Sequence, residues 1–258
     1  MATADPRERV RRALRTSLVH AWRRPAAALS SDTLVKLFHW SLAAISVSLC
    51  ACTVAPSPTA PSATITADTL AANDGFEPAF FRAFVQNAYE APGRLEPIRV
   101  LRGPLRLYLR TEDDAGRAID RITLETTERT LIDSARIWSG EKFGVVQVER
   151  GTRTREKVPG WITVKWPSTS LGDRCGRSTV GVEGGVIELN ASGACSCGMA
   201  TAIYPRLVRH ELGHAMGYYH TDHIADVMYG EPIPITACDT LPSERERRHA
   251  RFAHAELQ

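Results

Sequence analysis

Residues 210–220 read His-Glu-Leu-Gly-His-Ala-Met-Gly-Tyr-Tyr-His, which places three histidines around a glycine. His210 and His214 are four residues apart, so on a helix both rings project from one face. One Zn²⁺ can then bind a nitrogen of each ring at about 2.0–2.1 Å. Gly217 tolerates the left-handed conformation that ends a helix and turns the chain, which lets His220 return as a third ligand. A continuous helix would carry His220 about 9 Å beyond His214 along its axis.

Three protein ligands leave one position of a tetrahedral zinc ion open, which is typical of catalytic sites, whereas structural sites have four protein ligands. Water fills the open position, and zinc lowers the pKa of that water towards about 7. Glu211 follows the first ligand and can face the water without binding the metal. We expect Glu211 to accept a proton as the water attacks a peptide carbonyl, and then to deliver it to the leaving amine.

The long zinc motif 210–220 resembles the signature of the metzincin clan of metallopeptidases, most nearly its matrixin-like bacterial members. The resemblance implies a methionine in a tight turn beneath the zinc, and Met228 in residues 226–230 (Asp-Val-Met-Tyr-Gly) fits that packing role. Some metzincins have a tyrosine ligand two residues after this methionine. Gly230 occupies that position, which disfavours the astacin and serralysin subgroups. The resemblance covers roughly residues 97–258.

The order of expected elements around the motif indicates an α+β domain. The resemblance implies a twisted, mainly parallel sheet with an antiparallel edge strand, an active-site helix and a small C-terminal helical subdomain. It implies that residues 185–190 form the edge strand that pairs with an extended substrate. We expect Thr123 to cap its helix, and Ser243 or Thr240 to cap the last one. The apolar spacing predicts helices over 76–89, 123–139, 201–218 and after 241–243. It predicts strands over 100–109, 143–148 and 160–166, and a further strand over 185–190 after a Gly-rich bend.

The charge of the chain is unevenly distributed. Its 258 residues have a net charge of +3, but residues 1–36 alone carry +5, which leaves −2 from Thr53 onward. No basic stripe indicates a nucleic-acid partner, so we expect none. The length suits one sizeable core and no second catalytic module.

Residues 1–52 are interpreted as a targeting segment. Residues 37–55 are apolar and uncharged and follow a lysine, which is typical of a secretory signal. The strongly apolar part has about 14 residues, which is short for a bilayer span of about 20, so a membrane-spanning anchor is the alternative. Residues 1–34 are rich in arginine, and we hypothesise that translation starts near Val35; the alternative is a long basic region of the signal.

The end of the apolar run, Leu49-Cys50-Ala51-Cys52, resembles a bacterial lipoprotein cleavage box. The resemblance implies that Cys52 carries lipid, whereas cleavage near Ala51 or Ala55 would release a freely secreted protein. Either outcome places the protein in the cell envelope or beyond. Residues 53–75 are rich in Ala, Thr, Pro and Ser and are predicted to form a flexible tether, followed by a metallopeptidase domain over 76–258.

Four cysteines fall in the predicted domain: Cys175, Cys195, Cys197 and Cys238. An even number in an exported protein favours two disulfides, with three connectivities. A bond between Cys195 and Cys197 is disfavoured because neighbouring strand positions point apart, so each is expected to reach Cys175 or Cys238. The alternative is four free thiols in a reducing compartment.

The sequence therefore predicts an exported zinc endopeptidase that is a monomer, holds one catalytic Zn²⁺ and acts on an extended peptide or protein. A structural Ca²⁺ is also compatible with the sequence. The alternative is a lipid-anchored, non-catalytic zinc-binding interaction module on the same fold.

We expect His223 at the rim of the site, and His249 and His254 solvated or satisfied on the last helix. The arginines that alternate with glutamates there predict a solvated helix face: Arg245, Arg247, Arg248 and Arg251.

Overall fold

A computed structural model describes residues 75–255, except 145, 170, 173 and 192. These residues belong to one unit of the chain, Ser57–Gln258. The targeting segment, Cys52 and nearly all of the expected tether lie outside the described residues, so those hypotheses stay predictions. Of the helices that are described, none has the length and apolar character to cross a membrane.

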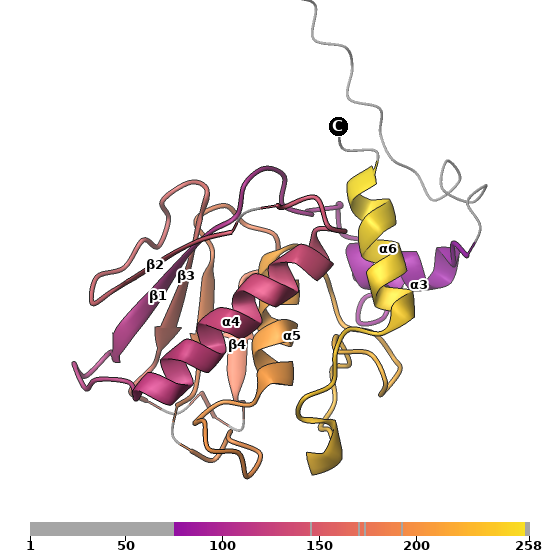
Figure 1. The fold of residues 1–258 in the computed structure, drawn as a ribbon. Coiled ribbons are helices and arrows are strands. Elements are labelled where there is room, and N and C mark those ends of the chain that lie inside the picture. The colour runs from indigo at the N-terminus through magenta and orange to yellow at the C-terminus, as the bar shows by residue number, and fades with distance from the viewer. Residues whose placement is uncertain (1–74, 145, 170, 173, 192, 256–258) are drawn as a thin grey trace, which may run out of the picture. The chain divides into compact units, whose positions relative to one another are not determined.

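A five-stranded sheet forms one layer of the domain, in the order β2-β1-β3-β5-β4 (Figure 1). All neighbours are parallel except β4 and β5, which are antiparallel, with Gly176 opposite Leu189. The predicted mainly parallel sheet with an antiparallel edge strand is confirmed. The strands are β1 (Arg106–Asp113), β2 (Gln147–Gly151), β3 (Trp161–Trp166), β4 (Gly176–Ser178) and β5 (Val186–Leu189).

The edge strand is not the segment that we expected. Residues 185–190 contain β5, which pairs with β3 on one side and β4 on the other, so its backbone cannot receive a further strand. The edge is the three-residue strand β4. The expectation came from the family resemblance rather than from the residues themselves. The three-residue strand β4 is too short to show the alternating pattern that would have marked it in the sequence.

Helices α4 (Arg121–Trp138) and α5 (Pro205–Ala215) lie side by side against one face of the sheet (Figure 1). The indole of Trp138 donates a hydrogen bond to the Arg209 carbonyl of α5 at 2.9 Å. At one end of the domain, α3 (Pro78–Gln86) packs against α6 (Glu244–Ala255). A short 3₁₀ helix, η1 (Ile235–Ala237), precedes α6.

Two helix N-termini show how local sequence sets the boundaries. The cap of α4 is Asp120 rather than Thr123, because the Asp120 carboxylate accepts the Thr123 N–H at 2.8 Å. Ser243 caps α6 as predicted: its hydroxyl accepts the Glu246 N–H at 3.1 Å, and the Glu246 carboxylate accepts the Ser243 N–H at 2.7 Å. This reciprocal pair is a capping box.

An aromatic cluster joins α3, α4 and the chain that follows α5. The rings of Phe84 and Tyr218 stack with centroids 4.3 Å apart, and Trp138 lies 5.3 Å from Tyr218. The Tyr218 hydroxyl donates to the Trp138 carbonyl. This cluster fixes the segment that leads to His220.

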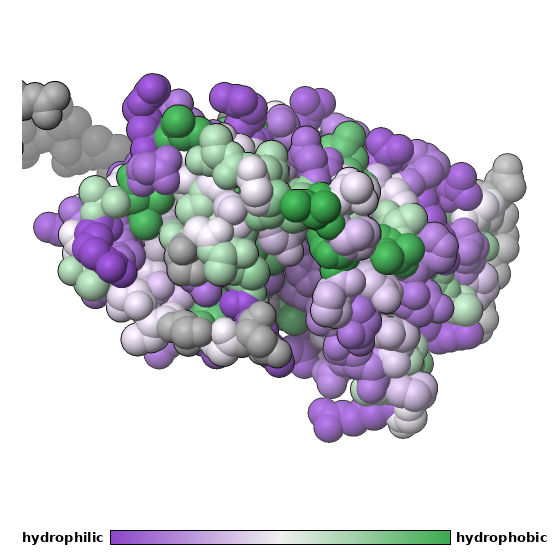
Figure 2. Space-filling model, turned by 90° about the horizontal axis from the view of Figure 1, so that it is seen from below, coloured by the Kyte–Doolittle hydropathy of each residue, from purple (hydrophilic) through white to green (hydrophobic). Residues whose placement is uncertain are grey.

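On the surface, the face in Figure 2 shows apolar residues in small groups between polar ones.

The two predicted disulfides are present, and they join Cys175 to Cys195 and Cys197 to Cys238. They connect three segments in series: the start of β4, the loop before α5 and the end of η1. Disulfides persist in oxidising compartments, so these bonds indicate an exported protein.

The two histidines of α6 are buried rather than solvated. His249 is satisfied: its Nε2 accepts the Glu77 N–H at 2.9 Å and its Nδ1 donates to the Arg245 carbonyl at 2.8 Å. His254 hydrogen-bonds to the Trp138 backbone, but its Nε2 has no partner among the described residues. Burial lowers the pKa of His254 to about 4.

We predict that His254 makes the fold sensitive to acid. The unfolded chain binds a proton near the ordinary histidine pKa of 6.5, whereas the folded protein binds it only near about 4, so the free energy of unfolding falls as the pH drops between these values. Between about pH 7 and pH 5, wild type should lose about 2 kcal/mol more than His254→Gln. Urea unfolding of both metal-free proteins measures this, and parallel pH profiles would contradict it.

Candidate metal site

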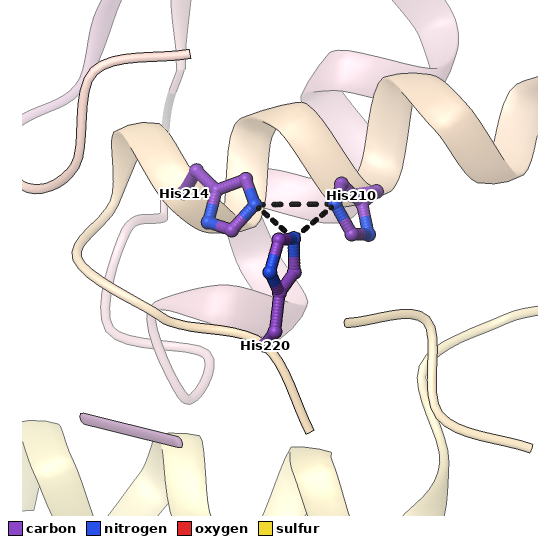
Figure 3. A group of neighbouring side chains, drawn as sticks. All are labelled: His210, His214 and His220. Atoms are coloured by element: carbon purple, nitrogen blue, oxygen red, sulfur yellow. Dashed lines mark hydrogen bonds between the residues drawn. The ribbon is translucent and has the colours of Figure 1, made fainter. Parts of the chain in front are cut away.

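The three histidines predicted from the sequence meet at one point (Figure 3). The Nε2 atoms of His210 and His214 are 3.1 Å apart, those of His214 and His220 are 3.0 Å apart, and those of His220 and His210 are 3.2 Å apart. A tetrahedral ion with bonds of 2.0–2.1 Å would hold neighbouring nitrogens about 3.3 Å apart. The spacing therefore matches what one such ion requires.

The other ring nitrogen of each histidine is bonded away from this point. The three Nδ1 atoms face acceptors that have no proton to donate: Val227 O for His210 at 2.8 Å, Tyr218 O for His214 at 2.8 Å and Glu90 Oε1 for His220 at 2.6 Å. Each neutral ring therefore keeps its hydrogen on Nδ1, and three Nε2 lone pairs converge without a donor between them. A bound cation satisfies this arrangement, so the residues fit a metal ion with three imidazole ligands.

Burial keeps the rings of His210 and His214 neutral. It lowers the pKa of His210 to about 4, and the nearby His220 lowers it further. It also lowers the pKa of His214 well below the ordinary value, with a smaller contribution from the two neighbouring histidines. Neutral imidazole is the form that binds a metal, so the site is prepared for a ligand role at neutral pH.

Gly217 makes the turn that brings His220 back. Helix α5 ends at Ala215, and Gly217 has a φ of +107° while its N–H donates to the His214 carbonyl at 2.8 Å. A Cβ at this position would lie 2.5 Å from the Arg99 carbonyl oxygen. Both the backbone conformation and the close approach therefore require glycine.

Met228 packs against the helix that carries the first two histidines. It is fully buried, and a Cβ on Gly213 would lie 2.4 Å from its sulfur. The sequence analysis assigned no role to Gly213. Glycine destabilises the interior of a helix, so its presence there could have indicated close packing against another part of the protein. Gly230 is similarly close to the site, because a Cβ there would lie 3.0 Å from the His220 ring.

A buried carboxylate of α6 holds the segment around Met228. Glu246 accepts the backbone N–H groups of Val227 at 3.0 Å and Met228 at 2.8 Å. The carbonyl of Val227 is the group that accepts the His210 Nδ1–H. Burial, with a contribution from Asp226, raises the pKa of Glu246 to about 7. Glu246 is therefore not part of a solvated face, and through Val227 it links α6 to a candidate ligand.

Asp226 completes this buried polar cluster. Its carboxylate accepts hydrogen bonds from the Thr221 hydroxyl at 2.9 Å, the Ser243 hydroxyl at 2.7 Å and the Arg245 guanidinium at 2.5 Å. Arg206 of α5 donates to the Asp226 carbonyl. The loop between His220 and Met228 is thus tied to both α5 and α6.

Glu211 is buried, follows His210 on α5 and is not part of the three-nitrogen group. Burial raises the pKa of its carboxyl to about 8, and its Oε2 has no partner among the residues that the structure describes. The carboxyl group lies against the edge strand β4, where a Cβ on Gly176 would be 2.4 Å from Oε1. His223 is exposed, and its Nδ1 accepts the Ala225 N–H at 3.2 Å, which is consistent with a rim position.

The sequence matches no protein-family model and no curated protein. Among solved structures, the chain is similar to metalloproteinase-II from Bacteroides fragilis, with 14% identity and a TM-score of 0.38 over 58% of this chain and 52% of that chain. It is also similar to a chain of a chaperone–substrate complex, with 10% identity and a TM-score of 0.32 over 62% of this chain and 36% of that chain. The chain thus spans about half the length of the first and about a third of the second.

We predict that Gly217→Ala weakens both the fold and metal binding. The free energy of unfolding should fall by about 1–3 kcal/mol, because alanine is strained at a φ of +107° and collides with the Arg99 carbonyl. Gly103→Ala is a matched control, since Gly103 has a φ of +92° with nothing within 4 Å of its Cβ position. Chelator competition should show weaker zinc binding for Gly217→Ala only. Equal zinc affinity in wild type and Gly217→Ala would contradict the role of this turn.

Proposed function

We propose that the protein is a zinc-dependent endopeptidase of the metzincin type. The observation that carries the proposal is the convergence of three Nε2 lone pairs. They come from a helix and turn with the sequence of residues 210–220, in which Glu211 directly follows the first histidine. Zinc held by His210, His214 and His220 would polarise the scissile carbonyl and lower the pKa of a water molecule. Three ligands leave a position for that chemistry, whereas a structural zinc site would use a fourth.

Glu211 is proposed as the general base. It neighbours His210 on α5, and its Oε2 has no partner among the described residues, so the oxygen remains available to accept a proton. The carboxylate would take a proton from the attacking water and transfer it to the nitrogen of the leaving amine, so that one side chain acts first as base and then as acid. The glycine at 176 gives this side chain room beneath β4.

The edge strand β4 is the proposed docking position for substrate. It pairs with β5 on one side only, and its Gly176 touches Glu211. An extended peptide that added to the outer edge of β4 would form backbone hydrogen bonds beside the base, which suits cleavage within a chain. The substrate is therefore proposed to be an extended or unfolded protein segment.

The protein is proposed to act outside the cytoplasm as a monomer. The two disulfides support an exported location. A lipid anchor at Cys52 and the cleavage that would expose it lie outside the described residues and stay predictions. The structural Ca²⁺ also stays a prediction, because the three-histidine group is the single candidate side-chain cluster among the residues that could be searched.

We predict that Glu211→Ala abolishes cleavage while zinc remains bound. Removing the base should lower casein cleavage by at least about 100-fold, and zinc content should be unchanged because Glu211 is not a ligand. A chelator should stop wild-type cleavage, and added Zn²⁺ should restore it.

The control variant is Glu188→Ala, which removes a carboxylate from the neighbouring strand β5, where Glu188 pairs with Lys165 and Arg177. It should retain most of the cleavage activity. If Glu211→Ala cleaved casein as fast as wild type, the proposed base would be wrong. If wild type bound zinc but cleaved no substrate of a broad panel, the non-catalytic interaction module would be favoured instead.

A further inference from the structure

The turn that carries His220 contacts a segment that lies more than 100 residues earlier in the sequence. We call residues 216–220 the ligand turn and residues 84–101 the N-terminal segment. The Arg99 carbonyl of this segment fills the space left by the missing Cβ of Gly217. Two backbone hydrogen bonds also join the two: Tyr219 N–H to Phe84 O at 2.7 Å and Leu101 N–H to Met216 O at 3.1 Å.

Glu90 lies in a closed loop within the N-terminal segment. Helix α3 ends where Asn87 adopts a left-handed conformation, with a φ of 59°. The Ala91 N–H then donates to the Asn87 carbonyl at 3.0 Å, and the Glu96 N–H returns to the Gln86 carbonyl at 2.8 Å. The loop is thus fixed at both ends, and it presents Glu90 to the ligand turn.

The side chain of Glu90 contacts the second nitrogen of His220. Its Oε1 lies 2.6 Å from His220 Nδ1, and the carboxylate is 49% exposed. The Nδ1 atoms of the other two histidines instead bond to backbone carbonyls. His220 is therefore the one member of the group whose orientation depends on a charged side chain.

A carboxylate in this position has a known chemical effect. It accepts the Nδ1–H, which fixes the tautomer with a free lone pair on Nε2, and its negative charge makes that lone pair a stronger donor to a cation. An exposed ion pair without this role would contribute little to the stability of the fold. The partner here is a residue whose Nε2 lies 3.0 Å and 3.2 Å from the two other candidate ligands.

We propose that Glu90 is a positioning residue of the metal site, which raises the affinity for zinc by holding His220 in its binding orientation and tautomer. The inference rests on the proposed zinc site. It makes the Glu90 side chain a part of the metal-binding unit, although Glu90 lies outside the zinc motif and precedes the whole sheet in the sequence.

The experiment measures the zinc dissociation constant of the full-length, metal-free protein against a chromophoric chelator. Glu90→Ala should bind zinc about 10–100-fold more weakly than wild type. Glu90→Gln should lose less, because its amide oxygen still accepts the Nδ1–H but lacks the charge. Glu96→Gln is the matched control: Glu96 lies at the end of the same loop, pairs with Arg99 at 3.2 Å, and should leave the affinity unchanged.

Two further readouts separate positioning from a general loss of structure. The unfolding midpoint of the metal-free protein should be the same for Glu90→Ala and wild type, because His220 is the only hydrogen-bond partner of the Glu90 side chain among the described residues. In protein with ¹⁵N-labelled histidine, the Nδ1–H resonance of His220 should move upfield in Glu90→Ala, whereas those of His210 and His214 should stay in place.

Zinc affinity of Glu90→Ala within about twofold of wild type would overturn the inference, and so would an equal loss in Glu96→Gln. These outcomes leave the endopeptidase proposal intact. A wild-type protein that binds zinc without cleaving peptides would instead remove the peptidase proposal and leave the role of Glu90 standing. A wild-type protein that does not bind zinc would overturn both.

Discussion

Three nitrogen lone pairs face one another at 3.0–3.2 Å, and the rest of the domain holds them there. When the three rings are neutral, their hydrogens lie on Nδ1 and none is shared at this point, so a cation would stabilise the arrangement. Helix α5 provides two of the rings by spacing alone, and the turn at Gly217 returns the third. Helices α4 and α6 and the loop after α3 act by fixing the acceptors behind these rings.

Each acceptor belongs to a different part of the molecule. The Val227 carbonyl is held by Glu246 from α6, and the Tyr218 carbonyl is held by an aromatic cluster and a hydroxyl bond to α4. Glu90 comes from the loop after α3. The three candidate ligands are therefore each held by a contact that originates at a different helix: α3, α4 or α6. The disulfide pair adds a brace between β4, which touches Glu211, and the loops on both sides of α5.

The local part of the site could be predicted from the sequence, because helix spacing and a turn glycine are properties of neighbouring residues. This accounts for the convergence of His210, His214 and His220, and for the turn at Gly217 that returns the third ring. Glu90 and Glu246 could not be predicted in the same way. Glu90 lies 130 residues before its histidine, and the charge pattern around Glu246 is indistinguishable from that of a solvated helix. The edge strand was misassigned because the resemblance placed it at residues 185–190, whereas the true edge strand β4 is too short to show a strand pattern in the sequence.

The proposed metal ion, held by three imidazoles with one open position, would account for the three converging lone pairs. X-ray absorption at the zinc edge of the zinc-loaded protein tests this ligand set most directly. We expect three imidazole nitrogens and one oxygen at about 2.0–2.1 Å. A sulfur scatterer near about 2.3 Å, or fewer than three imidazoles, would contradict the proposed site.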